Sequence, residues 1–481
     1  MRIEPVSLKG YDLLHRGVQA FADLERRGIR IDTEFCERKR KHLQRQIERM
    51  ERKIAESPEG KVWRKHYGSK TNFNSPTQLN HVLYNLLGLK KDEDSSTDRD
   101  SLEDLDLEMA RHIVDYRRLQ NICNKYLLAF TRDSLDGILH PSWNLHTVRT
   151  YRSSSSNPNF QNIPKRDAVA QEICRRAIIP RQDHMIMEAD FSGIEVRIAA
   201  CYNEDPVLIA YITDPTRDMH RDMCQKIYKL KDDQWTKLTR YSAKNGFVFP
   251  EFYGDYYAHC AMQLWKNIDK LNLTTRDGQN LREHLHDHGI HDYQQFERHV
   301  QNIEDEFWNE RFKVYTKWKN KQISFYEKHG YVELFTGFRC SGIMKKNDVI
   351  NYPIQGSAFH CLLWSLIHLN DEMKAQKYRS WIIGQIHDSI NADVFPDEYN
   401  RIIKLFFQVT TEELAKTWKW IVVPLEIELE IATMNASWYE IKQVHPQKCD
   451  VCFARYMYKT DKSYECPLCG DVKEISNGTA A

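Results

Sequence analysis

Strand-like segments are few in this 481-residue chain, and long helical stretches separate them. An apolar run begins at Met185, and alternating apolar residues cover 381–395 and 421–431. Between the first two of these segments, residues from about 214 to 330 carry mostly helical patterns and loops. So few strands around such an insert predict an α+β fold, with a small antiparallel sheet surrounded by helices.

The size and composition of the chain are those of a globular protein with several subdomains. The length exceeds what one hydrophobic core supports and predicts two to four subdomains. Hydrophobic residues make up 41% and charged residues 28% of the chain. The sequence shows neither a signal peptide nor an apolar run that could cross a bilayer, so we expect a cytoplasmic protein without a membrane partner. Eight of the 12 cysteines are scattered singly, which favours reduced thiols.

Positive charge is concentrated near the N-terminus, although the formal net charge of the chain is only +1. Residues 37–70 carry 12 Lys or Arg against 5 Glu, with Leu43, Ile47, Met50 and Ile54 at helical spacing. This pattern predicts a basic amphipathic helical arm. An ordinary solvated helix explains the segment equally well.

Two aspartates mark the ends of strand-like runs, Asp190 in Met-Ile-Met-Glu-Ala-Asp-Phe-Ser and Asp388 in Ile-Ile-Gly-Gln-Ile-His-Asp-Ser. Each has a local explanation in part: Ser192 with Glu195 matches a capping box, and an Asp is common at a hairpin turn. As a pair they suit two Mg²⁺ ions about 3.5 to 4 Å apart, which need carboxylates from separate strands. Such ions would activate a primer hydroxyl and neutralise a departing pyrophosphate.

Between the two aspartates, Arg240 and Lys244 stand four residues apart on one helical face. Like charges at this spacing repel, so helix stability gives no reason for it, whereas a bound triphosphate does. A solvated charged face is the alternative. Aromatic residues that could support a base or sugar, or simply belong to the core, follow: Phe247, Phe249, Phe252 and Tyr253. Pro250 among them would kink a helix and indicates an irregular element.

Two polar segments are candidates for contacts with a nucleic acid. Residues 149–164 are rich in Ser and Asn and contain Arg149 and Arg152, a composition that fits a backbone-tracking loop or a plain solvated one. Asn351 and Gln355 place two amides where a base edge or sugar could be contacted. We expect a helix to begin at this segment, and helix capping explains Asn351 better when it is taken alone.

The strongest single motif lies at the C-terminus, where Cys449-Asp-Val-Cys452 is followed after thirteen residues by Cys466-Pro-Leu-Cys469. Two CxxC pairs at this separation predict a tetrahedral four-thiolate zinc site of the closed, structural kind. The zinc would fold a ribbon that is too short to build a core of its own.

Five of these segments resemble motifs of the family A DNA polymerases, the bacterial DNA polymerase I group, and they follow the family's order. Residues 188–197 resemble motif A, 240–254 motif B and 385–388 motif C. Residues 150–164 and 351–358 also have family counterparts, so the resemblance extends from about residue 21 to 440. It implies a right-hand polymerase fold with a palm containing an antiparallel sheet and mostly helical fingers and thumb, plus the zinc ribbon.

The resemblance also implies roles for single residues. Asp190 and Asp388 would bind two catalytic Mg²⁺ ions, with the carbonyl of Phe191 assisting. Glu195 would crowd the 2′ position of the sugar and so select deoxynucleotides. The residues that would hold the incoming triphosphate or flank the nascent base pair are Arg240, Lys244, His220, Phe249 and Tyr253. Those that would contact primer and template are Arg149, Arg152, Asn351, Gln355 and His387.

Three positions depart from the family's pattern. The aromatic residue that the family has four positions after the motif B lysine is Val248 here, and Phe249 is one further. Because Phe249 keeps the four-residue spacing to Tyr253, we assign the stacking role to Phe249. Pro250 replaces a usual glycine, and Ser389 stands where motif C usually has Glu.

The resemblance implies a division of the chain into regions. They are an N-terminal segment leading into the palm (1–36), a thumb (37–135), palm with motif A (136–214), fingers with motif B (215–345), palm with motif C (346–443), and the zinc ribbon and tail (444–481).

The implied activity is that of a DNA-directed DNA polymerase of phage type, which adds deoxynucleoside triphosphates to primer-template DNA during replication. It would work at the nucleoid of a bacterial or phage-infected host cell. Because about twenty residues precede Phe21, we expect no 3′ to 5′ exonuclease domain in the chain. A separate exonuclease, helicase or processivity factor would then be a partner. The alternatives are a single-subunit RNA polymerase, against which Glu195 argues, and a non-catalytic nucleic-acid-binding protein on a polymerase scaffold.

Overall fold

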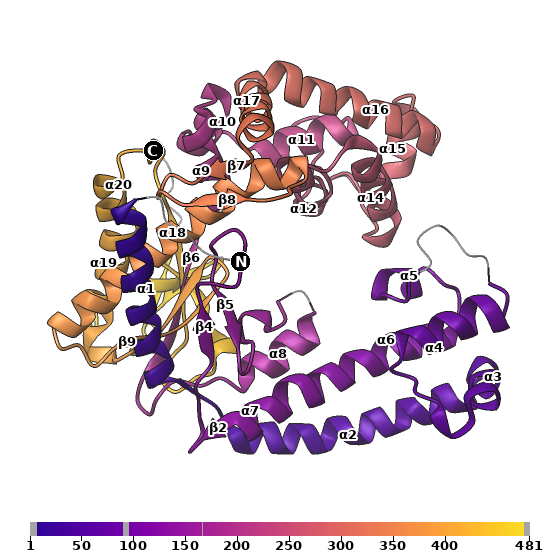
Figure 1. Ribbon diagram of the computed structural model, residues 1–481, viewed down its shortest axis with the longest axis horizontal. Helices are drawn as coiled ribbons and strands as arrows, with labels where there is room; N and C mark the ends of the chain where they lie inside the picture. The colour runs from indigo at the N-terminus through magenta and orange to yellow at the C-terminus, as the bar shows by residue number, and fades with distance from the viewer. Residues whose placement is uncertain (1–6, 90–95, 166, 476–481) are drawn as a thin grey trace.

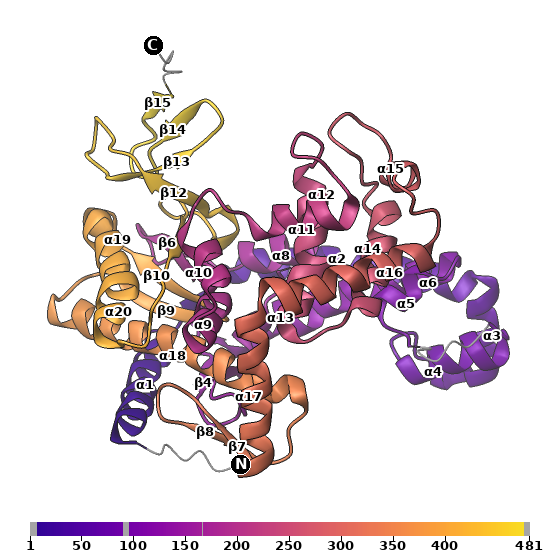
Figure 2. The same cartoon turned by 90° about the horizontal axis from the view of Figure 1, so that it is seen from above.

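The computed structural model describes residues 7–89, 96–165 and 167–475. The chain forms a sheet unit from which a helical arm (residues 33–133) and a helical lobe (residues 206–329) extend on the same side (Figure 1). A small ribbon stands away from the rest of the sheet unit in the second view (Figure 2). Parts of the expected N-terminal segment and of the expected tail, residues 1–6 and 476–481, lie outside the described residues.

The sheet unit is built on an eight-stranded antiparallel sheet of order β15-β14-β13-β12-β11-β6-β10-β9. The expected antiparallel sheet is thus confirmed, and the ribbon extends it at one edge. Its strands are β6 (Met185–Phe191), β9 (Trp381–Ile386), β10 (Ser389–Val394), β11 (Ile427–Ile431), β12 (Lys442–Pro446), β13 (Tyr456–Lys459), β14 (Ser463–Glu465) and β15 (Val472–Glu474).

The alternating segment 421–431 forms a shorter strand than its pattern predicts. Burial alternates along the whole segment, but only Ile427–Ile431 pairs as β11. Pro424 has no amide hydrogen to donate to a neighbouring strand, so pairing before it is disfavoured. The period-two pattern therefore reports which side chains face the core, and the pairing begins later.

Helices cover the sheet. The longest, α18 (Lys346–Ala375), is buried along most of its length and contacts both β9 and β10. It packs against α1 (Leu8–Arg27) and α9 (Ile194–Asn203) (Figure 1). The remaining helices of the sheet unit are α8 (Ala168–Arg176), α19 (Tyr399–Phe407), α20 (Leu414–Thr417), the π-helical η8 (Gln408–Glu413), and the short turns η7 (Pro396–Glu398) and η9 (Trp438–Glu440).

The helical arm contains the basic segment. Asp32 caps α2 (Thr33–Glu56), which buries Leu43, Ile47 and Ile54 and packs on α6 (Glu108–Gln120), so the segment is the amphipathic helix that its spacing predicts. Its other elements are α3 (Pro58–Tyr67), η1 (Gly68–Lys70), α4 (Pro76–Asn80), η2 (His81–Leu86), α5 (Arg99–Glu103), η3 (Asn121–Leu127) and α7 (Leu128–Asp133).

The helical lobe is inserted between β6 and β9 in the chain. Its elements are α10 (Pro206–Thr213), α11 (Met219–Tyr228), α12 (Lys237–Ala243), η5 (Lys244–Val248), α13 (Phe249–Tyr253), α14 (Tyr257–Lys270), α15 (Leu281–Asp287), α16 (Tyr293–Glu306), η6 (Phe307–Arg311) and α17 (Lys313–His329). The lobe meets the far end of the arm, where Lys266 Nζ lies 3.0 Å from Asp104 Oδ2. The arm, the lobe and the sheet unit are therefore arranged as a ring (Figure 1).

The ribbon is joined to the sheet by more than strand pairing. The hydroxyl of Tyr458 on β13 donates to the carbonyl of Ile431 on β11 at 2.9 Å, and that of Tyr399 on α19 donates to the carbonyl of Tyr456 at 3.0 Å. The ring of Tyr456 stacks on that of Phe407. These contacts fix the ribbon to the outer edge of the sheet, away from the space between arm and lobe (Figure 2).

Three small antiparallel sheets complete the described residues. They contain β1 (Ile29–Arg30), β2 (Ser134–Leu135) and β3 (Ile138–Leu139); β4 (Ser142–Asn144) and β5 (Ser154–Ser156); and β7 (Tyr331–Glu333) and β8 (Arg339–Ser341). A short turn, η4 (Phe160–Asn162), follows β5. Among the described helices, none combines the length and apolar character needed to cross a membrane.

Candidate active site

The two aspartates meet where β6 ends and β9 turns into β10. Asp190 pairs with Ser389, the residue after Asp388, and the amide of Phe191 donates to the carbonyl of Asp388 at 3.0 Å. His387, in the same turn, adopts a left-handed conformation with φ 50°. Two segments that are about 200 residues apart in the sequence are thus held side by side by backbone hydrogen bonds.

Both carboxyl groups lie where their charge is poorly compensated. Burial raises the pKa of Asp388 to about 6, and burial also raises the pKa of Asp190. Arg152 Nη2 at 3.8 Å from Asp388 and Lys165 Nζ at 3.7 Å from Asp190 offset this only in part. Mg²⁺ prefers oxygen ligands, and two neighbouring carboxylates whose negative charge the protein only partly neutralises offer such ligands. This donor set therefore fits the two Mg²⁺ ions that family A polymerases use.

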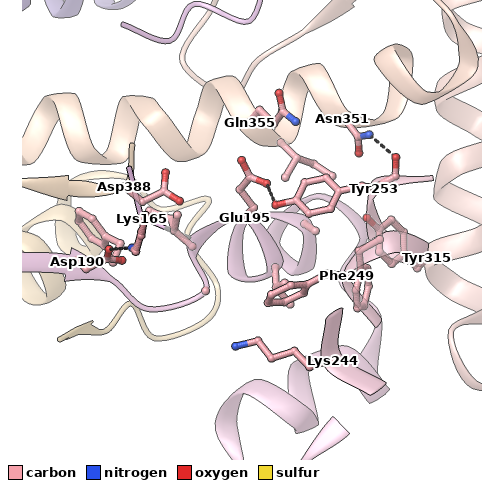
Figure 3. Close-up of a pocket in the computed structure, with 17 residues that line it drawn as sticks. Lys165, Asp190, Glu195, Lys244, Phe249, Tyr253, Tyr315, Asn351, Gln355 and Asp388 are labelled. Carbon is pink, nitrogen blue, oxygen red and sulfur yellow. Dashed lines mark hydrogen bonds and ion pairs between the residues drawn. The ribbon is translucent and has the colours of Figure 1, made fainter. Parts of the chain in front are cut away.

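A cavity of about 380 Å³ opens beside this pair. Figure 3 shows Asp190 and Asp388 on one side of it, with Lys244, Phe249 and Tyr253 on the other. Of the residues expected from the sequence, it brings together the following: Asp190, Phe191, Glu195, Lys244, Phe249, Tyr253, Asn351, Gln355 and Asp388.

Glu195 projects into the cavity from the first turn of α9. It accepts a hydrogen bond of 2.6 Å from the hydroxyl of Tyr253 (Figure 3). It also forms an ion pair with Arg152. The capping-box explanation is wrong, because α9 is capped by Gly193 in a left-handed conformation and Ser192 Oγ lies near Glu428 instead. The carboxylate of Glu195 is therefore available to the cavity.

A π-helical turn explains why Phe249 lies one position later than the resemblance expects. Lys244 and Phe249 are five residues apart, which in an α-helix would place them about 140° apart around the axis. Residues Lys244–Val248 form the wider turn η5, which absorbs the additional residue, so that the Lys244 ammonium lies 4.9 Å from the centre of the Phe249 ring. Phe247 and Val248 are buried in the lobe. The helical backbone continues from η5 into α13, so Pro250 directly follows the π-helical turn, and that turn is the irregular element which the proline indicates.

His220 and Arg240 lie just beyond the residues that line the cavity. The ring of His220 meets the edge of Phe249 at 5.6 Å between centroids, and burial lowers the pKa of His220 to about 4. Arg240 holds Asp218 through two hydrogen bonds of 2.6 and 3.0 Å. An incoming phosphate would compete with Asp218 for this guanidinium.

Asn351 and Gln355 reach the cavity from within α18. The helix begins at Lys346, five residues before Asn351, so the expectations that a helix begins at Asn351 and that this residue caps it are both wrong. Asn351 instead donates from Nδ2 to the carbonyl of Tyr253 at 3.0 Å (Figure 3). It thus ties the sheet unit to the end of α13.

Three further residues expected to contact DNA lie in different places, namely Arg149, Arg152 and His387. Arg152 reaches Glu195 and Asp388, whereas Arg149 points away and donates from Nη2 to the carbonyl of Ile343 at 3.1 Å. Burial, followed by the charges of Arg152 and Lys165, lowers the pKa of His387. None of the three side chains is among the lining residues of the cavity.

Among the lining residues with polar side chains, two were missed in the sequence, Lys165 and Tyr315. Lys165 directly follows the Ser- and Asn-rich loop, and a cation next to such a loop was a usable signal. Tyr315 comes from α17, far along the chain, and its sequence neighbourhood carries no signal for this position.

The four C-terminal cysteines form a separate cluster, in which all four sulfur atoms lie within 4.8 Å of one another. The Sγ atoms of Cys449 and Cys469 are 3.6 Å apart, and those of Cys452 and Cys466 are 3.4 Å apart. Disulfide sulfurs are about 2.05 Å apart, whereas four sulfurs at about 2.3 Å from one zinc are about 3.8 Å from each other. The cluster therefore fits the predicted structural zinc.

The comparisons with known proteins agree with this geometry. The family model "DNA polymerase family A" matches residues 33–440. The chain belongs to this family. Its fold is similar to that of the POL domain of Pol1 from M. smegmatis in a complex with DNA primer-template and dNTP, with a TM-score of 0.69 and 22% identity, covering 89% of this chain and 70% of that one. The family A right-hand fold is thereby confirmed.

Curated relatives are DNA polymerase I proteins. The chain is 26% identical to that of Chloroflexus aurantiacus over 439 residues, which cover 86% of this chain and 42% of the relative. It is 27% identical to that of Geobacillus stearothermophilus over 432 residues, with 88% and 45% covered. The chain thus spans less than half the length of these family A relatives.

Proposed function

We propose that this chain is a DNA-directed DNA polymerase that adds deoxynucleotides to the 3′ end of a primer. The observation that carries the proposal is the meeting of Asp190 and Asp388 at one end of a cavity whose opposite side presents Lys244 and Phe249. A carboxylate pair facing a cation and an aromatic ring suits a triphosphate whose base stacks and whose phosphates approach two metal ions.

Each side chain at the cavity has a proposed task. Bound Mg²⁺ ions supply charge neutralisation and lower the pKa of the primer hydroxyl. Asp190 and Asp388, with the Phe191 carbonyl, hold these ions. Lys244 contacts the triphosphate from η5, while Phe249 and Tyr253 flank the nascent base pair. Glu195, held by Tyr253 and Arg152, occupies the place where a ribose 2′-hydroxyl would lie.

Arg240 and His220 complete the triphosphate contacts in this proposal. Arg240 exchanges the carboxylate of Asp218 for a phosphate oxygen. His220, which is neutral because its pKa is low, offers a hydrogen bond. Arg152, Asn351, Gln355 and His387 face the primer terminus and its template base. Arg149, which points away from the cavity, contacts the DNA backbone.

The three parts of the fold take the places of a hand. We assign residues 37–135, which contain most of the arm, to the thumb and residues 215–345, which contain the lobe from α11 onward, to the fingers. The palm is assigned to residues 136–214 and 346–443, which contain most of the sheet unit and α10. Residues 1–36 lead into the palm, and 444–481 form the ribbon and tail. Primer-template DNA would lie in the space that these parts enclose.

The proposed setting is DNA replication in the cytoplasm, at the nucleoid of a bacterial or phage-infected cell. The substrates are primer-template DNA and deoxynucleoside triphosphates. A separate exonuclease, helicase or processivity factor would act beside the chain.

Primer extension with deoxynucleotides and ribonucleotides offered separately tests the proposal. The wild-type protein is expected to extend with deoxynucleotides and to reject ribonucleotides. Glu195→Ala opens the 2′ position and should reduce this discrimination by about 10- to 200-fold, the range expected for a small steric difference. Glu283→Ala, an exposed change on α15, is the control and leaves discrimination unchanged.

The results also separate the alternatives. Efficient extension with ribonucleotides by the wild-type protein would support a single-subunit RNA polymerase. DNA binding without extension by either nucleotide class would support a non-catalytic binding protein.

A further inference from the structure

A pair of acids, one buried and one half-buried, lies behind the turn that faces the nucleotide cavity. Phe249 and Tyr253 of α13 line the cavity, and Glu251 lies between them, about 200° around the helix from each. Its side chain therefore points into the lobe, and only 2% of the residue is exposed. Its neighbour in the lobe is Glu304, at the end of α16, which hydrogen-bonds to it.

The pair connects several elements of the lobe. Trp308 Nε1 on η6 donates to Glu251 Oε2 at 2.7 Å, and the thiol of Cys260 on α14 donates to Oε1 at 3.6 Å. Glu304 Oε1 accepts a hydrogen bond of 3.0 Å from the amide of Tyr257, the first residue of α14. The back of α13 is thus attached to α14, η6 and α16 through two carboxyl groups.

Other charged groups face the pair: Lys319 acts on both acids, and Asp305, the residue after Glu304, acts on Glu304. On α17, Lys319 Nζ lies 3.1 Å from the centre of the Trp308 ring, and burial lowers the pKa of Lys319 to about 8. Asp255, which follows α13, is hydrogen-bonded to His259. Burial and the neighbouring Glu304 raise the pKa of Glu251, and burial raises the pKa of Glu304. Because Glu251 is buried and in contact with a second, half-buried carboxyl, ionising both groups is costly, and the pair favours one shared proton at neutral pH.

Stability alone does not account for an acid at this place. An apolar side chain of similar size would avoid the desolvation cost, and replacing buried polar groups in this way is often neutral or stabilising. What the pair does provide is directional contact, because the hydrogen bonds that Trp308 and Cys260 donate to Glu251 hold the back of α13 in a defined orientation. Phe249 and Tyr253 extend from the opposite face of the same five-residue helix.

We propose that Glu251 is a positioning residue, which together with Glu304 orients α13 so that Phe249 and Tyr253 receive the incoming nucleotide. The inference rests on the proposed polymerase activity and adds a residue that touches neither substrate nor metal. Loss of the shared proton would place a second negative charge between α13 and α16. The turn would then shift, and nucleotide binding would weaken while the carboxylates that hold the metals stay in place.

The test compares steady-state primer extension by the wild-type protein, Glu251→Gln and Glu251→Leu between about pH 6 and 9, a window that brackets the raised pKa. Glu251→Leu should raise KM for the deoxynucleotide several-fold, with a smaller change in kcat. Glu251→Gln, which keeps the hydrogen bond from Trp308 and cannot ionise, should restore the wild-type KM near neutral pH. It should also remove the rise in KM that the wild type shows at alkaline pH. Glu283→Gln on α15 is the matched control.

Two results would overturn the inference. One is a Glu251→Leu protein whose KM stays within about twofold of wild type. The other is a Glu251→Gln protein with the same alkaline rise in KM as the wild type. If Glu251→Leu fails to fold, the comparison of Glu251→Gln with the wild type decides alone. If the wild-type protein extends no primer at all, the proposed function fails as well. If the wild type does extend the primer and one of these two results is found, only this inference fails and the proposed function stands.

Discussion

The chain carries two groups of proposed metal ligands on one sheet, and they are built in opposite ways. Asp190 and Asp388 come from strands about 200 residues apart in the sequence and face an open cavity of about 380 Å³. The four ribbon cysteines lie within 21 residues, and their sulfur atoms form a closed set. The open group leaves coordination positions for a substrate, whereas the closed group has none to spare. The open group therefore suits catalysis, and the closed group suits stabilisation of the fold.

The largest expected effect concerns the open group. Asp388→Asn keeps the shape of the turn and removes one of the two carboxylates, so primer extension should fall on the order of 10³-fold, about 4 kcal/mol of transition-state stabilisation. Single-turnover extension with saturating Mg²⁺ measures it. Asp136→Asn is the matched control, since Asp136 is exposed in a distant turn with φ 51°, a conformation that Asn tolerates. Extension by Asp388→Asn within about tenfold of the wild type would remove the metal assignment.

The closed group is expected to affect folding far more than chemistry. Cys466→Ser should abolish the single bound zinc and the hydrogen-exchange protection of β13 to β15, because a ribbon of this size folds with its metal. Extension should change by less than about tenfold, since the ribbon docks on the outer edge of the sheet. Zinc analysis, hydrogen exchange and extension on the same sample check this. A loss of extension as large as that of Asp388→Asn would mean that the ribbon shapes the catalytic strands.

The two groups also differ in how far the sequence predicts them. The cysteines are recognisable from spacing alone, because one local segment supplies every ligand. Each carboxylate is ambiguous when taken alone. The capping explanation for Glu195 fails in the structure, and the turn explanation for Asp388 weakens once β6 and β10 are seen to pair beside it. The strands and the amphipathic helix α2 follow from periodicity. The π-helical turn at Lys244–Val248 does not, since one added residue can be absorbed by a bulge or by a shift of the whole helix.

Other parts of the site depend on packing that the sequence does not reveal. Asn351 stands within α18 because the helix starts earlier than its polar segment indicates. Tyr315 enters the cavity from a helix with no motif of its own. Glu251 lies in a motif but faces away from the cavity, and only the positions of Trp308 and Glu304 show why it is buried.

The smallest expected effect is on the free energy of unfolding, which should rise in Asp388→Asn and fall in Cys466→Ser. Burial raises the pKa of Asp388 from 3.8 to about 6, so the ionised group destabilises the folded state above pH 6 and the cost vanishes below about pH 4. With a side chain that is 34% exposed, solvent screening reduces the cost to about 1 kcal/mol. Asp388→Asn should therefore be more stable than the wild type by this amount at pH 7 without Mg²⁺, and Cys466→Ser should be less stable.

Urea unfolding in Mg²⁺-free buffer at pH 4, 5, 6 and 7 measures this difference, with the zinc left in place. The gain of Asp388→Asn should shrink as the pH falls from 6 to 4. A gain that is independent of pH would assign the effect to packing at the turn.

The central claim is that Asp190 and Asp388 form one metal-dependent site for nucleotidyl transfer. The most direct measurement is a structure of the protein with primer-template DNA, a primer that lacks its 3′-hydroxyl, Mg²⁺ and the next deoxynucleoside triphosphate. The account predicts metal density between the two aspartates, the triphosphate against Lys244 and the base against Phe249. A triphosphate bound elsewhere, or metal density that leaves either aspartate without a contact, would contradict it.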